Sequence, residues 1–208
     1  MKRFIGRYIR HIEWVLGAMV TLLSLAAWLT TREGSGALTI YDVFPPLGLL
    51  AFGLMWTHFV TGALRRYAGV SRKGQDWYRT VSMGVVLALL VLHPGLLLLG
   101  LYSDGYGLPP GSYLQVYGSQ SWLVLMGTVA LMIFLAYELH RWYGDRSWWR
   151  YVDYTQFPAM VLILIHAVGL GGELDVGWFR LVWACYGMTL VVSAVCLSVW
   201  DNKQKGKV

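Results

Sequence analysis

Charged side chains are scarce in this sequence of 208 residues: they make up only 13% of it, whereas hydrophobic residues make up 57%. The charges lie between long apolar runs rather than within them. Such a distribution excludes an ordinary water-soluble domain and is typical of a polytopic membrane protein, for which we expect an all-α fold.

Cysteine is also scarce, with Cys185 and Cys196 as its two occurrences, both in the last apolar run. Eleven helical residues separate them by about 16 Å, which is too far for a disulfide. We interpret both as ordinary core residues that say little about the redox compartment. Internal repeats, low-complexity tracts and a separate soluble domain are not evident, so 1–208 is predicted to be one transmembrane domain.

Six apolar runs have about the 20 residues that a helix needs to cross a membrane. The first is expected to be an uncleaved span, because no small-x-small cleavage site follows it. Proline is tolerated in the first turn of a helix, so we expect Pro45 and Pro46 at the start of the second span and Pro158 at the start of the fifth. The runs are 14–31, 43–64, the residues between Arg79 and Asp104, 118–140, the residues between Asp153 and Glu173, and 181–200.

The basic residues predict the orientation of these six spans. With both termini in the cytoplasm, fifteen of the seventeen Lys and Arg residues fall on the inner side, and only Arg32 and Arg180 fall outside. The sequence therefore predicts a bundle of six transmembrane helices with both termini cytoplasmic. The net charge of +6 then reflects topology and contact with anionic membrane lipid, not nucleic-acid binding.

Two histidines lie deep in the apolar runs, His93 in the third and His166 in the fifth. Counting 1.5 Å per residue from the midpoint of each span places both about 5 Å toward the outer side. An ionisable side chain in hydrocarbon is costly, so two at one depth indicate a shared partner. His58 falls about 4 Å to the inner side and His140 about 15 Å inward, so these two are not level.

A haem fits two level histidines, because a flat apolar porphyrin can lie between antiparallel helices with an imidazole on each face of the iron. We therefore predict that His93 and His166 are the axial ligands of one b-type haem. Pro94 is expected to loosen the helix and help to orient the ring of His93. Close backbone approach is expected at five glycines, Gly84, Gly95, Gly100, Gly169 and Gly171. The alternative is that each histidine simply hydrogen-bonds to a neighbouring helix.

Two motifs accompany these histidines. The third run carries Arg79 and Gly84 before His93, and a basic aromatic segment leads to His166 through Arg141, Gly144, Arg146, Trp148, Trp149, Arg150 and Tyr154. Over about 63–170 the chain resembles the ferric reductase-like transmembrane family, whose core would cover about 43–175 here. The resemblance is strongest to its short bacterial members, the haem-binding membrane subunits of the periplasmic methionine sulfoxide reductase system.

This resemblance implies a b-type cytochrome of the bacterial inner membrane that passes electrons from a quinol or flavin donor on the cytoplasmic side to a periplasmic acceptor protein or metal. It also implies FMN or a quinone as a candidate second cofactor. In one respect the chain departs from the family: Asp153 stands where the family has its first fifth-helix histidine, which favours a single haem. Because the chain ends eight residues after Trp200, we expect a separate flavoprotein or a quinol as donor.

Arginines and aromatic residues near the inner face are candidates for binding that donor or a haem propionate. We single out Arg79, Arg146, Arg150 and Trp149, although basic loops and interfacial tryptophans are also ordinary signals of topology. His58 can hydrogen-bond to a propionate or quinone oxygen, or to a neighbouring helix.

Three alternatives to the one-haem carrier stay open. In the first, His58 and His140 hold a second haem. In the second, the histidines line the path of a non-redox transporter. In the third, the chain is a structural subunit of a respiratory complex. In each redox reading the chain is an electron-transfer subunit and is not expected to be catalytic alone.

Overall fold

The structure is a computed structural model in which residues 2–32, 36–70, 76–143 and 149–205 are described. These residues form helices and no strand, which confirms the all-α prediction. The elements are α1 (Lys2–Thr31), α2 (Ile40–Ala68), α3 (Trp77–Ser103), α4 (Gly111–Tyr117), the 3₁₀ turn η1 (Gly118–Gln120), α5 (Ser121–Tyr143), α6 (Trp149–Leu170), the 3₁₀ turn η2 (Gly172–Asp175) and α7 (Gly177–Lys205).

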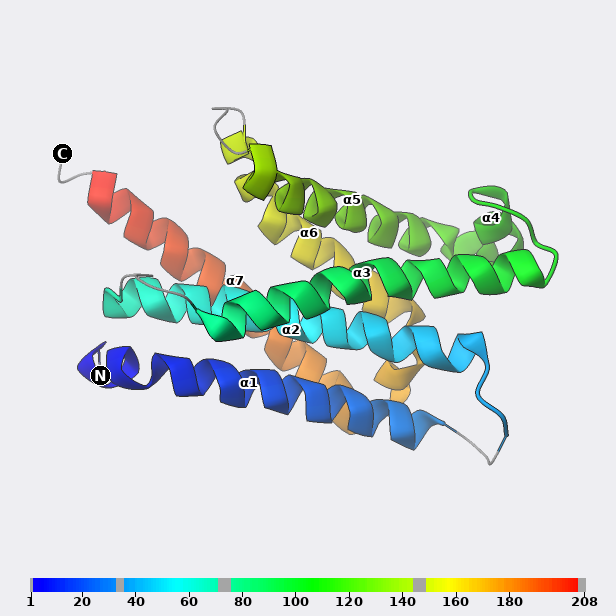
Figure 1. Cartoon of the computed structure of the whole chain (residues 1–208), viewed down its shortest axis with the longest axis horizontal. Helices are drawn as coiled ribbons and strands as arrows, with labels where there is room; N and C mark the ends of the chain where they lie inside the picture. The colour runs from blue at the N-terminus through cyan, green and yellow to red at the C-terminus, as the bar shows by residue number, and fades with distance from the viewer. Residues whose placement is uncertain (1, 33–35, 71–75, 144–148, 206–208) are drawn as a thin grey trace.

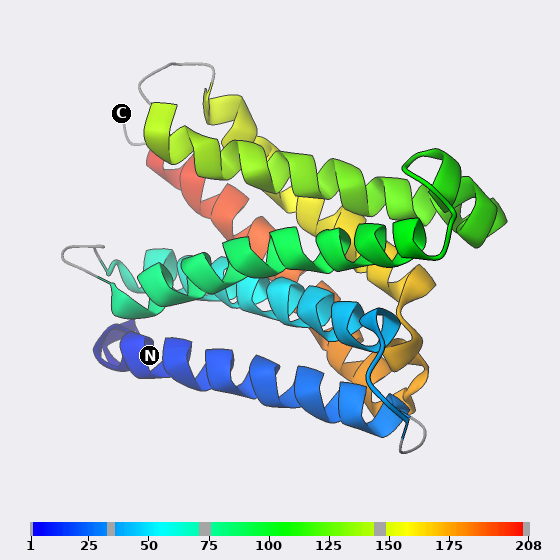
Figure 2. The same cartoon turned by 45° about the vertical axis from the view of Figure 1, so that its right-hand side comes forward.

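The long helices α1, α2, α3, α5, α6 and α7 run back and forth between the same two ends of a bundle (Figure 1, Figure 2). The starts of α1, α3 and α6 and the last turns of α2, α5 and α7 lie at one end, which we call the N-terminal end. Short α4 lies at the opposite end, between α3 and α5. The first and last helices of the chain thus have their free ends on the same side.

Five helices of the described residues are long and apolar enough to span a membrane, which agrees with the prediction of a membrane protein. They cover Gly6–Thr31, Ile40–Ala68, Trp77–Ser103, Gly111–Glu138 and Gly177–Ser198. The remaining predicted span corresponds to α6, whose apolar part, Tyr154–Leu170, is shorter. Pro158, expected in the first turn of that span, lies nine residues into α6.

Helix α2 begins five residues before Pro45, so neither Pro45 nor Pro46 occupies the first turn predicted for them. The start is set by a capping box, in which the backbone N–H of Thr39 donates to Asp42 Oδ2 at 2.8 Å. Pro46 has no N–H for the carbonyl of Asp42, and the indole Nε1 of Trp28 donates to that carbonyl instead, at 2.8 Å. A donor from α1 thus replaces the hydrogen bond that Pro46 cannot give within α2.

A buried ion cluster joins the first three helices near the N-terminal end. The guanidinium of Arg65 on α2 bonds to both carboxylate oxygens of Glu13 on α1, at 2.6 and 2.7 Å, and to Asp76 Oδ2 at 2.7 Å. Asp76 caps α3 by accepting from the backbone N–H of Arg79 at 3.3 Å. The Arg65 and Glu13 side chains are only 9% and 4% exposed, so the cluster is satisfied internally.

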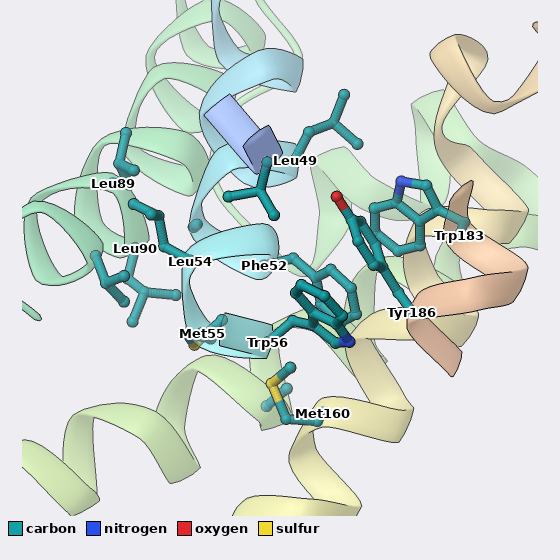
Figure 3. Packing of buried hydrophobic residues seen from close by; sticks show 14 of the residues in the cluster. Leu49, Phe52, Leu54, Met55, Trp56, Leu89, Leu90, Met160, Trp183 and Tyr186 are labelled. Atoms are coloured by element: carbon teal, nitrogen blue, oxygen red, sulfur yellow. The ribbon is translucent and has the colours of Figure 1, made fainter. Parts of the chain in front are cut away.

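The apolar core is centred on α2, which packs against α1, α3 and α7. Phe52 is fully buried and, with Trp56, meets Trp183 and Tyr186 of α7, while Met160 of α6 lies beneath them (Figure 3). Outward-facing positions also carry large apolar side chains, as expected of helices that face lipid. Cys185 and Cys196 belong to this outer surface: both are exposed free thiols, not the core residues expected from the sequence.

Candidate functional site

His93 on α3 and His166 on α6 lie side by side although 73 positions separate them in the chain. Their ring centroids are 6.4 Å apart and the two ring planes are nearly perpendicular, at 88°. Both rings line one cavity. The structure thus brings together the two residues that the sequence predicts to share a ligand.

Each imidazole is held by a backbone carbonyl of the preceding long helix. His93 Nδ1 lies 2.7 Å from the carbonyl oxygen of Phe44 on α2, and His166 Nδ1 lies 2.8 Å from that of Leu123 on α5. A carbonyl can only accept, so these contacts assign the proton to Nδ1 and leave a lone pair on Nε2. This hydrogen bond to the second ring nitrogen is the usual way in which a metal-binding histidine is oriented.

Two glycines allow the imidazoles to lie against the neighbouring helices. A Cβ at Gly48 would come within 2.7 Å of Cε1 of His93, and a Cβ at Gly127 would come within 2.8 Å of Nδ1 of His166. Contacts this short are essentially unknown for a real Cβ atom, so any other residue would push the ring away. Gly48 and Gly127 are therefore part of the site.

The same arrangement occurs twice in the chain. In α2, the Phe44 carbonyl accepts from His93, and Gly48, four residues later, lies against the His93 ring. In α5, the Leu123 carbonyl and Gly127, again four residues later, have the same relation to His166. The pairs α2–α3 and α5–α6 therefore present their histidines to each other as two similar halves. No repeat was evident in the sequence, because the likeness lies in a carbonyl and a glycine rather than in similar side chains.

The cavity between these halves has apolar walls. The space between its walls that no atom fills is about 1120 Å³, a figure that includes the part open to the surroundings. Most of its wall is aliphatic or aromatic, with few polar groups besides the histidines. Its residues come from α2, α3, α4, α5, α6 and α7 and from Gly171, which joins α6 to η2. The helical ones include Phe44, Leu49, Phe52, Pro94, Tyr113, Tyr117, Thr128, Leu170 and Trp183.

The distance between the rings matches that of two imidazoles on one metal. A first-row metal binds an imidazole nitrogen at about 2.0 Å and the ring centroid lies roughly 1.1 Å beyond, so two axial rings have centroids about 6 Å apart. The observed separation is 6.4 Å. In the described residues, no group of three or more His, Cys, Asp or Glu side chains could hold a metal ion.

Of the glycines predicted to allow close approach, Gly84 and Gly95 have no neighbour within 4 Å of an added Cβ. Gly100 faces Tyr41 and Gly169 faces Leu123, while an added Cβ on Gly171 would meet the Ala167 carbonyl oxygen. The glycines that face the histidines are instead Gly48 and Gly127, on the opposite helices. Counting 1.5 Å per residue from the midpoint of each span, as for the histidines, would have placed Gly48 and Gly127 at about the depth of His93 and His166.

His58 lies apart from the histidine pair. Its Nε2 is 3.0 Å from the Ser82 hydroxyl, its ring centroid is 5.8 Å from that of Tyr78, and it does not line the cavity. The Tyr78 hydroxyl in turn lies 2.6 Å from that of Thr57. His58 therefore takes part in a polar contact between α2 and α3, which was one of the two roles expected for it. The side chain of His140 lies outside the described residues.

The predicted donor-binding residues are only partly described. Arg79 Nε lies 3.3 Å from Met83 Sδ on the same helix, and Arg65 belongs to the buried ion cluster. Arg146 lies outside the described residues, as do the side chains of Trp149 and Arg150, which begin α6.

No protein-family model matches this chain, and the comparisons with curated proteins and with solved structures likewise find no match. The resemblance to the ferric reductase-like family therefore rests on the motifs around His93 and His166.

Proposed function

We propose that this chain is a b-type cytochrome subunit that carries electrons through one haem held by His93 and His166. The observation that carries the proposal is the spacing of the two rings, 6.4 Å between centroids, across a cavity that both of them line. Two imidazoles are the whole protein ligand set of a six-coordinate haem, whose other four iron ligands come from the porphyrin.

The surroundings of the two histidines support a role as metal ligands. In each imidazole, Nδ1 donates a hydrogen bond to a backbone carbonyl, so Nε2 carries the lone pair that a metal requires. The apolar wall of the cavity suits a porphyrin, which is flat and apolar apart from its propionates. When bound, a haem with two histidine ligands supplies one-electron chemistry between the ferric and ferrous states and has no open position for oxygen.

For the topology, we propose six spans with both termini in the cytoplasm of a bacterium, α6 being the span that completes the five long apolar helices. The distribution of Lys and Arg supports this orientation, and so does the position of the start of α1 and the end of α7 at one end of the bundle (Figure 1). The N-terminal end is then the cytoplasmic one.

This orientation places the haem toward the periplasm. His93 lies ten residues before the end of α3, and His166 four residues before the end of α6, so both are within about 15 Å of the periplasmic end. A periplasmic protein or metal acceptor can approach on that side. A quinol or a separate flavoprotein donates from the cytoplasmic side, which is the arrangement that the resemblance to ferric reductase-like proteins implies.

A reduced-minus-oxidised visible spectrum of the purified full chain, with haem counted per chain, tests the proposal. We expect one b-type haem per chain, lost in His93→Ala and in His166→Ala, and retained in His58→Ala and His140→Ala. Half the haem content in His58→Ala or His140→Ala would indicate two haems instead. A wild-type chain without haem absorbance after expression with ample haem would contradict the proposal and favour a transporter or a structural subunit.

A further inference from the structure

Two hydrogen-bond donors on α7 are buried without a partner. Trp183 is 2% exposed and Tyr186 is 4% exposed, and neither the indole Nε1 of Trp183 nor the hydroxyl of Tyr186 has a hydrogen-bond partner. Of the buried side-chain polar atoms in the described residues, only the hydroxyl of Ser112 shares this condition. A buried polar group without a partner destabilises the folded chain, so a pair of them one helical turn apart calls for an explanation.

The neighbouring indole in the same aromatic cluster is satisfied. Trp56 of α2 packs on Tyr186 with ring centroids 4.5 Å apart, and its Nε1 donates to the Thr189 hydroxyl at 2.8 Å. Trp183 stacks on Phe52 with centroids 4.4 Å apart and an angle of 16° between planes. Both tryptophans thus have full apolar contact, and they differ in whether the N–H finds an acceptor.

One of the two unpartnered donors belongs to a residue of the cavity wall, Trp183, whereas Tyr186 adjoins Trp183 at 6.2 Å between ring centroids and does not itself line the cavity. Trp183 is a wall residue of that cavity, as are Phe52 and Leu49. The indole nitrogen of Trp183 and the hydroxyl of Tyr186 both point toward the Leu49 end of α2 (Figure 3). Trp183 thus brings an N–H without an acceptor to the cavity wall, and Tyr186 adds a second free donor on the next turn of α7.

We propose that Trp183 and Tyr186 form the binding site for a propionate carboxylate of the haem. This inference rests on the proposed function, because it takes the occupant of the cavity to be a b-type haem, whose only oxygen acceptors are its two propionates. A carboxylate accepts hydrogen bonds more strongly than a neutral oxygen does. The cost of burying two free donors in the folded chain is recovered when the haem binds, and the pair fixes the rotation of the porphyrin about the axis through the two histidines.

The test compares three variants of the full haem-loaded chain: Tyr186→Phe, Trp183→Phe and, as a matched control, Trp56→Phe. Haem loss is measured as transfer to excess apomyoglobin, and the propionate bending band is measured by resonance Raman spectroscopy. Because hydrogen bonds to a charged group are stronger than those between neutral groups, we expect Tyr186→Phe and Trp183→Phe each to lose haem on the order of ten times faster. Both should shift the propionate band, whereas Trp56→Phe should leave rate and band unchanged.

Tyr186→Phe keeps the aromatic ring and removes only the hydroxyl, so it tests the site even if Trp183→Phe folds poorly. Wild-type rates and an unshifted band in Tyr186→Phe, with the haem still bound by two histidines, would overturn this inference and leave the proposed function standing. This inference would also be overturned if the variants kept their haem but no longer bound decylubiquinone, because the two donors would then hydrogen-bond to a quinone carbonyl. A wild-type chain that binds no haem would remove the proposed function itself, and this inference with it.

Discussion

The imidazole planes of His93 and His166 are nearly perpendicular, at 88°, while their centroids are 6.4 Å apart. The cause lies in the backbone, because each ring is fixed by a hydrogen bond from Nδ1 to a different helix. Perpendicular axial rings leave the two iron orbitals that interact with them close in energy. We therefore predict a ferric low-spin EPR spectrum of the highly anisotropic type, with one large g value.

The spectrum of the oxidised full chain at liquid-helium temperature checks this prediction. His58→Ala is the control and should give the same signal, because His58 lies outside the cavity. A rhombic spectrum of the kind given by parallel imidazoles would show that the rings rotate when the haem binds.

The glycines facing the histidines offer a second prediction. In Gly48→Ala and Gly127→Ala, the added methyl group overlaps the imidazole of His93 or His166, and the ring must move away from its carbonyl. Changes in the groups that orient a metal-binding histidine typically cost 10–100-fold in metal affinity. We expect haem retention to fall by about that factor, as measured by absorbance after purification.

Gly84→Ala and Gly95→Ala are matched controls on α3, since a Cβ at either position has no neighbour within 4 Å. They should keep the haem and gain up to about 1 kcal/mol in stability, because glycine disfavours a helix. Equal haem loss in all four variants would mean that helix flexibility, not ring position, is being changed.

The buried ion cluster predicts a large loss of stability in Arg65→Met. This change leaves the carboxylate of Glu13, 4% exposed, without its bidentate partner, and breaking a buried ion pair costs on the order of 3 kcal/mol. Unfolding in mixed micelles with increasing SDS measures it. The control is Arg180→Met, because the 3.6 Å pair of Arg180 with Asp175 is largely exposed and should contribute less than about 1 kcal/mol. Similar losses in both variants would contradict the structural role of the cluster.

Glu173 in η2 predicts a dependence of stability on pH. Burial raises the pKa of Glu173 above its ordinary value of 4.5, although a backbone hydrogen bond acts in the opposite sense. The folded chain therefore holds this proton more tightly than the unfolded chain does. The contribution of the protonated Glu173 to the stability of the folded chain is complete below pH 4.5 and is lost as pH rises through the raised pKa of the folded state.

Thermal unfolding of wild type and Glu173→Gln at a series of pH values measures this effect. The variant should gain stability relative to wild type as pH rises through that window, because glutamine stays neutral. Asp175→Asn is the control, since the Asp175 side chain is 83% exposed and should show little change. A constant difference between wild type and Glu173→Gln over the whole pH range would exclude titration of Glu173 as the cause.

Much of the helical framework could be predicted from the sequence, because apolar runs report helix length directly. The helix starts were harder to predict. Pro45 and Pro46 predicted a start that the capping box of Thr39 and Asp42 places earlier, and Trp28 supplies the Asp42 carbonyl with the donor that Pro46 lacks. A hydrogen bond between two helices is not visible in the composition of either one.

The same division applies to the candidate site. The depths of His93 and His166 follow from counting residues along each run, because the rise per residue of a helix is constant. The sequence by itself therefore determined that two imidazoles lie in the same layer of an apolar helical bundle. Only the tertiary structure decided that they lie side by side on one cavity, that the Phe44 and Leu123 carbonyls orient them, and that Gly48 and Gly127 lie against their rings. Those relationships depend on how each helix is rotated about its axis and on which helices are neighbours, and packing between distant segments sets both.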